Sequence, residues 1–80
     1  ELNFHVADAG RALAAVEAKY APGAQSVSKA DGVTMVLGSW WFNLRMSNTE
    51  PVVRLNLEST ASQDEMRAKV AELSAAIQGS

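Results

Sequence analysis

Residues 40–58 read WWFNLRMSNTEPVVRLNLE, and this stretch is the strongest indication of the fold because two alternating segments meet at a short polar turn. In each segment apolar side chains occupy every second position, which is the period of a half-buried β-strand. Pro51 suits the first residue of the second strand, where a missing amide donor does least harm. The side chains predicted to face the core are Trp40, Phe42, Leu44, Met46, Val53, Leu55 and Leu57. The stretch therefore predicts an antiparallel strand pair joined by the loop 47–51.

Further strands are predicted on the N-terminal side of this pair. Residues 33–37 form an apolar run, and the preceding Ala30-Asp31-Gly32 is a turn signal in which glycine can take a positive φ. Gly38-Ser39 marks another turn, and residues 25–29 are a weaker strand candidate. At the start of the chain, apolar residues alternate with polar ones over 2–6, which predicts one more half-buried strand.

Two helices complete the pattern. Asp8 stands in an N-cap position before an alanine-rich segment, and Pro22-Gly23 ends that segment. Its apolar positions at helical spacing are Ala9, Leu13, Val16 and Tyr20. Ser62 and Glu65 form a Ser-x-x-Glu capping box for the second helix. The apolar positions of that helix are Met66, Val70, Leu73 and Ile77, and the charged ones read as a solvated face are Asp64, Glu65, Arg67, Lys69 and Glu72. The order predicts an α+β fold, an antiparallel sheet with two helices packed on one face.

Composition limits what such a chain can do. Its 80 residues make one domain with a thin core. The absence of cysteine excludes disulfides and thiolate metal sites. A formal charge of −2 argues against general nucleic-acid binding, which needs a basic surface. No apolar run is long enough to cross a bilayer. Because the chain opens without an initiator methionine or a signal-peptide pattern, we expect a piece of a larger cytoplasmic protein.

Two arginines flank the polar loop of the strand pair. Strand alternation puts Arg45 and Arg54 on the same face, away from the predicted core, although alternation alone does not set the distance between them. Between them, Ser47, Asn48 and Thr49 offer hydroxyl and amide donors and favour turns with outward backbone amides. A guanidinium fork beside such a turn predicts a cradle for a phosphate or carboxylate group.

Other interpretations of the open sheet face stay possible at this point. The loop can be an ordinary hairpin turn, with arginines that only promote solubility. Trp41 can serve as a stacking platform in a single-stranded nucleic-acid-binding α+β module, although the acidic charge and the lack of further aromatics on that face argue against it. The exposed face also permits an oligomerisation domain, which no positive feature supports.

The loop resembles a known signature. Arg45-x-Ser47-Asn48-Thr49-Glu50-Pro51, followed by Arg54 and Glu58, is similar to the C-terminal-domain motif of the phosphohexomutases, and most to the bacterial phosphomannomutase/phosphoglucomutase branch. Three more segments resemble that family: the opening at 3–8, Asp31-Gly32 and the strand 40–43. The resemblance covers essentially the whole chain.

The resemblance implies a four-domain parent enzyme that interconverts hexose 1-phosphates and hexose 6-phosphates through a bisphosphorylated intermediate. Such enzymes use a phosphoserine and Mg²⁺, and their last domain has a TATA-binding-protein-like fold. Residues 1–80 would be that fourth domain, which binds the non-reacting substrate phosphate and closes the active-site cleft. By position, the phosphate contacts would be Arg45, Ser47, Asn48 and Thr49, with Arg54 as a second arginine nearby.

The departures from the family pattern are equally informative. No serine has the phosphoserine context, no Asp-x-Asp-x-Asp metal loop is present, and the sugar-recognition loop of the family is missing. The chain therefore holds no catalytic or metal-binding residue of its own. Mg²⁺ and a hexose 1,6-bisphosphate would serve the parent enzyme, and this domain alone would bind neither. Its expected partners are a phosphosugar and the other domains of the enzyme, with no nucleic acid and no membrane.

Overall fold

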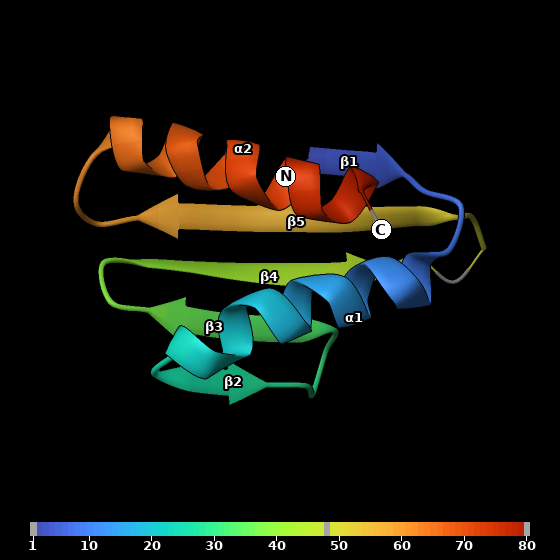
Figure 1. The fold of residues 1–80 in the computed structure, drawn as a ribbon, viewed down its shortest axis with the longest axis horizontal. Coiled ribbons are helices and arrows are strands. Elements are labelled where there is room, and N and C mark those ends of the chain that lie inside the picture. The colour runs from blue at the N-terminus through green and yellow to red at the C-terminus, as the bar shows by residue number, and fades with distance from the viewer. Residues whose placement is uncertain (1, 48, 80) are drawn as a thin grey trace.

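The computed structural model describes residues 2–47 and 49–79, and it has the predicted α+β architecture (Figure 1). Its elements in chain order are β1 Leu2–His5, α1 Ala9–Tyr20, the 3₁₀ turn η1 Ala21–Gly23, β2 Ser26–Ser28, β3 Val33–Leu37, β4 Trp40–Met46, β5 Val52–Ser59 and α2 Gln63–Gln78. All five predicted strand segments and both predicted helices form, with bounds within a few residues of those that the sequence indicates.

The strands form a single antiparallel sheet of order β1-β5-β4-β3-β2. β4 and β5, the pair that the central stretch predicts, lie in the middle of the sheet beside each other (Figure 1). Leu44 pairs with Leu55 and Phe42 with Leu57, so apolar side chains meet across the pair on one face. The last pairing between β4 and its other neighbour, β3, joins Leu44 to Val33, although β4 continues to Met46. Arg45 and Met46 therefore extend past the end of β3.

Helix α1 lies against β3 and β4, and α2 lies against β5 on the same side of the sheet (Figure 1). The cap prediction for α1 is confirmed, since the Asp8 carboxylate accepts a hydrogen bond from the Arg11 amide at 3.1 Å. Its buried face is formed by Ala12, Val16 and Tyr20. Leu13, which the sequence analysis placed on that face, packs against the core but is only half-buried.

The cap of α2 corrects one expectation. The Ser62 hydroxyl accepts from the Glu65 amide at 3.0 Å, as a capping box requires. The reciprocal bond is replaced, because the Glu65 carboxylate accepts from the hydroxyls of Ser39 and Ser59, each at 2.7 Å. The Ser62 amide is directed to the Ser59 hydroxyl at 3.4 Å instead. Glu65 is thus half-buried in a tertiary contact, and the prediction that it belongs to the solvated face is wrong.

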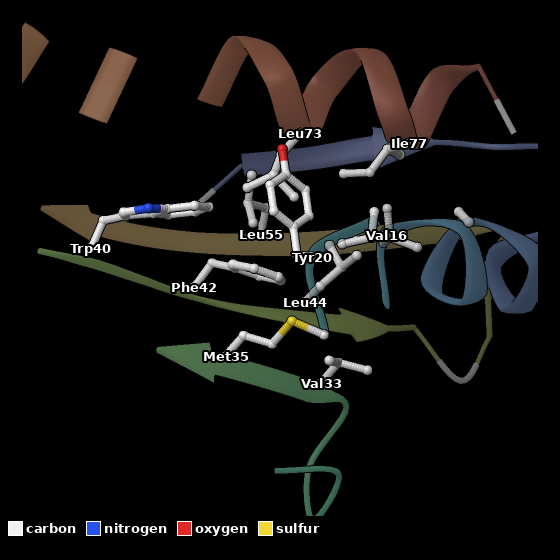
Figure 2. Close-up of a cluster of buried hydrophobic side chains, with 12 residues drawn as sticks. Val16, Tyr20, Val33, Met35, Trp40, Phe42, Leu44, Leu55, Leu73 and Ile77 are labelled. Carbon is white, nitrogen blue, oxygen red and sulfur yellow. The ribbon is translucent and has the colours of Figure 1, made fainter. Parts of the chain in front are cut away.

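The core lies between the helices and one face of the sheet (Figure 2). Its aromatic centre is formed by Tyr20, Trp40 and Phe42, whose ring centroids lie 5.6–5.8 Å apart. Two residues of the central pair differ from the alternation. Met46 is 49% exposed because it lies beyond the end of β3, and Val52 is buried although it points to the open face. Alternation fixes the direction of a side chain, but what covers it depends on the surrounding elements.

No helix in the described part of the chain has both the length and the apolar character that crossing a bilayer requires.

Candidate functional site

The pairing of β4 with β5 brings the two loop arginines together. Arg45 lies directly opposite Arg54, on the face that the helices leave open. Side chains at directly opposite positions of an antiparallel pair start about 5 Å apart, and like charges there destabilise the pair. An anion bound between the two guanidinium groups would offset this repulsion. The arrangement therefore suits a site for an anionic ligand.

The two arginines line a hollow of about 570 Å³ at the end of the sheet where β4 extends past β3. The residues that line it are Leu13, Asp31, Gly32, Arg45, Met46, Ser47, Thr49 and Arg54. Four of the five residues that the sequence predicts for a phosphate site thus border one cavity. The fifth, Asn48, lies outside the residues that the structure describes.

The loop between the strands uses its own backbone donors. The Ser47 amide donates to the Val52 carbonyl at 2.9 Å and so closes the hairpin. The Thr49 amide donates to the Ser47 hydroxyl oxygen at 3.4 Å. The expectation of outward backbone amides therefore does not hold for Ser47 and Thr49, because the short turn needs them to satisfy its own acceptors. What these two residues offer to a ligand is their hydroxyl groups.

Asp31 contributes a negative charge to the same hollow. Its Oδ2 lies 3.4 Å from Nη1 of Arg45, and the Asp31 side chain is 78% exposed against 37% for Arg45. The sequence analysis treated Asp31 only as part of a turn and of the family resemblance. Its contact with Arg45 spans 14 positions of the chain and depends on how β3 packs beside β4, so no local pattern indicates it.

Trp41, the residue behind the nucleic-acid alternative, lies on the open face but is half-buried. It pairs with Val36 on one side and with Glu58 on the other. The other aromatic side chains of the described strands, Phe4, Trp40 and Phe42, pack on or in the core. A single indole beside a carboxylate has no second stacking partner among the described strands, whereas proteins that bind a nucleic-acid strand stack successive bases on several aromatic side chains. The structure does not favour this alternative.

Among the described residues, no group of three or more His, Cys, Asp or Glu side chains lies close enough together to hold a metal ion. The chemistry that the hollow does offer is the binding and orientation of an oxyanion. Two guanidinium groups supply charge and directed donors, and two hydroxyls supply further donors.

The amino-acid sequence of the chain is similar to that of known proteins. The family described as "Phosphoglucomutase/phosphomannomutase, C-terminal domain" matches residues 1–76. A phosphomannomutase of Salmonella montevideo is 48% identical over 73 residues, which cover 91% of this chain and 16% of that protein. A protein of Xanthomonas campestris pv. campestris (strain B100) named "Phosphohexose mutases" is 39% identical over 79 residues, which cover 99% of this chain and 18% of that protein.

A third relative has a similar match. A phosphomannomutase of Methanocaldococcus jannaschii is 36% identical to this chain over 73 residues. In each of these three relatives, the matching region is between 16% and 18% of the relative's length. The chain thus spans about a sixth of the length of the curated relatives that it matches.

Proposed function

The chain belongs to the family of phosphoglucomutase/phosphomannomutase C-terminal domains, and from this premise we propose that it binds the substrate phosphate within a phosphohexomutase. The observation that supports the proposal most directly is the register that sets Arg45 opposite Arg54 at the rim of one hollow. The parent enzyme would interconvert hexose 1-phosphates and hexose 6-phosphates, and residues 1–80 would be its fourth and last domain.

In this proposal each residue of the site has a distinct part. Arg45 presents the fork that matches two phosphate oxygens, and Arg54 adds a second positive charge from the neighbouring strand. Ser47 and Thr49 donate hydroxyl hydrogens, and Asn48 adds an amide donor. A hydrogen bond to a charged partner contributes roughly 1.5–3 kcal/mol, so two or three of them suffice for a weak but specific site.

Phosphate binding at this site would help catalysis by orienting the substrate. If the hollow holds the phosphate that does not react, the sugar is oriented with its other end toward the reacting group, which reduces the entropic part of the barrier. Closure of the domain over the cleft would exclude water and strengthen the same contacts. The phosphoserine, the Mg²⁺ and the bisphosphorylated intermediate would belong to the remaining domains.

The test is a two-dimensional NMR titration of the ¹⁵N-labelled chain with glucose 1-phosphate, with inorganic phosphate and glucose as comparison ligands. We expect a Kd of about 1 mM or weaker, because the open hollow does not exclude solvent. Shifts should concentrate at Arg45, Ser47, Thr49 and Arg54, occur with both phosphates and be absent with glucose. Shifts spread over α1 and α2, or none at concentrations of tens of millimolar, would contradict a preformed phosphate site in this chain.

Substitution of the arginines separates binding from folding. Arg45→Ala should weaken phosphate binding by about tenfold or more, since it removes charge-assisted hydrogen bonds. It should change the free energy of unfolding by less than about 0.5 kcal/mol, because the relieved repulsion by Arg54 offsets the lost exposed ion pair with Asp31. Arg45→Lys should also lose most of the affinity, as an ammonium group cannot form the two-pronged contact. Ser47→Ala should cost less.

Arg67→Ala is the matched control for these variants. Arg67 is an exposed arginine of α2 whose ion pair with Asp64 lies outside the residues that line the hollow. This substitution removes the same charge and should leave phosphate binding unchanged. An equal loss of affinity in Arg45→Ala and Arg67→Ala would show that only net charge matters, and a collapsed fold in Arg45→Ala would contradict its assignment to ligand binding.

A further inference from the structure

We infer that Asp31 is a positioning residue for the phosphate site, which holds the guanidinium group of Arg45 in one direction at the rim of the hollow. The inference rests on the proposed function and adds a residue to it. Asp31 would not contact the phosphate as a donor, since a carboxylate can only accept. Asp31 would act on the site through Arg45, since Nη1 of Arg45 lies 3.4 Å from Oδ2 of Asp31.

The backbone at Asp31 is held in place by two contacts with β4. The Asn43 side chain donates to the Asp31 carbonyl at 3.0 Å and to the Thr34 hydroxyl at 2.9 Å. Gly32, with a φ of +70°, lies so close to β4 that a Cβ on it would be 2.8 Å from Cγ of Arg45 and 2.4 Å from the Leu44 carbonyl oxygen. The turn therefore packs directly against the aliphatic part of Arg45. With its backbone anchored in this way, the Asp31 carboxylate is kept within reach of the guanidinium group.

The topology places Arg45 between two charges of opposite sign. β4 lies between β5 and β3, so Arg54 of β5 is on one side of Arg45 and the turn that leads into β3 is on the other. Repulsion from Arg54 and attraction to Asp31 therefore act on the guanidinium group in the same direction. An arginine side chain has large rotamer entropy, part of which is lost when it binds a ligand. If the guanidinium group is already oriented, binding costs less of this entropy. Asp31 would thus raise the affinity of the site although its own charge repels phosphate.

The experiment compares the side-chain mobility of Arg45 in the wild type and in Asp31→Asn. The ¹⁵N heteronuclear NOE of the Arg45 Nε reports motion on the picosecond-to-nanosecond scale. We expect a high value in the wild type and a value close to that of the exposed Arg67 in Asp31→Asn. Asp64→Asn is the matched control, because it breaks an Asp–Arg ion pair of α2, 3.8 Å long, outside the hollow. It should leave the Arg45 signal unchanged.

A phosphate titration of the same variants gives the second readout. Asp31→Asn should bind inorganic phosphate about three- to fivefold more weakly than the wild type, a loss in the range of one exposed ion pair. An unchanged Arg45 NOE in Asp31→Asn would overturn the inference. Tighter phosphate binding would also overturn it, because Asp31 would then be a competitor for Arg45. If the wild type binds no phosphate, the proposed function fails, and the NOE still decides whether Asp31 orders Arg45.

Discussion

Arg45 and Arg54 occupy directly opposite positions of β4 and β5, where like charges disfavour the strand pair that carries them. The pair is tolerated here because both side chains reach solvent at the rim of the hollow, Arg45 being 37% exposed. The repulsion between these two arginines thus makes folding slightly less favourable, and an anionic ligand bound between them would reduce that repulsion.

Gly32 and Gly38 provide a test of how closely the turn before β3 packs against β4. Both glycines have a positive φ, +70° and +69°. Alanine at Gly38 would meet nothing within 4 Å, so Gly38→Ala should cost only the backbone term, about 1 kcal/mol. Gly32→Ala adds a collision with the Leu44 carbonyl oxygen, and we expect about 3 kcal/mol. Urea unfolding of both variants measures the difference, and equal losses would contradict the close approach.

At the scale of the element, Glu65 fastens the start of α2 to the sheet. Its carboxylate accepts from Ser39, in the turn between β3 and β4, and from Ser59, at the end of β5. Hydrogen bonds from these two hydroxyls lower the pKa of Glu65 below its ordinary value, with a smaller contribution from Lys69. The Glu65 side chain thus positions the start of α2 relative to β5 and to the turn between β3 and β4, in addition to the cap that Ser62 provides.

The lowered pKa makes this contact dependent on pH. Because the folded-state pKa is the lower one, the stabilisation is present above the ordinary value of 4.5 and is lost as the pH falls through the folded-state value. Glu65→Gln should therefore have a lower Tm than the wild type at pH 7, and the gap should shrink near pH 3. Asp64→Asn controls for a lost charge in the same helical turn. A gap that stays constant between pH 7 and pH 3 would contradict the role of the Glu65 charge.

At the scale of the whole molecule, Tyr20 joins both helices and the sheet. It is buried in the core, where its ring contacts Trp40 and Phe42 edge-on, and its hydroxyl donates to the Glu72 carboxylate of α2 at 3.2 Å. Figure 2 shows its ring reaching from α1 toward α2 above the side chains of the sheet. The Nζ atom of Lys69 lies 5.2 Å from the centroid of the Trp40 ring and 3.3 Å from Oε2 of Glu72. The helices are therefore linked through a tyrosine that also belongs to the sheet core.

Burial of Tyr20, together with the charge and the hydrogen bond of Glu72, raises its pKa from about 10 to about 12. Between these values the unfolded chain releases the phenol proton and the folded chain retains it, so stability falls as the pH rises above 10. Tyr20 is the single tyrosine of the chain, so absorbance at 295 nm reports it alone. We expect a midpoint about two pH units higher in native buffer than in urea. The same midpoint in both would contradict the burial of Tyr20 and its contact with Glu72.

Tyr20→Phe completes this test. The variant should lose about 0.5–1.5 kcal/mol of stability at pH 7, the usual contribution of one hydrogen bond. Its unfolding free energy should also decline less steeply between pH 10 and pH 12 than that of the wild type. A variant with the wild-type alkaline slope would show that other groups control unfolding in this range.

Local patterns were sufficient for the elements, but not for the contacts among them. Alternation over 40–46 and 52–58, the glycines at turns and the Asp8 and Ser62 caps predicted where strands and helices lie, because each depends on neighbouring residues alone. The same alternation could not predict that Met46 is exposed and Val52 buried, since both depend on which elements lie beside the end of β4.

The α+β class, the face on which Arg45 and Arg54 lie and the polar loop between them could thus be read from the amino-acid order, since side-chain direction in a strand follows from its period of two. The folded structure was needed to show that the two arginines lie directly opposite each other, that Asp31 pairs with Arg45 and that Glu65 accepts hydrogen bonds from Ser39 and Ser59. These pairings join residues distant in the chain. They depend on the register and packing of the whole sheet, which the free energy of the complete core selects and no short segment encodes.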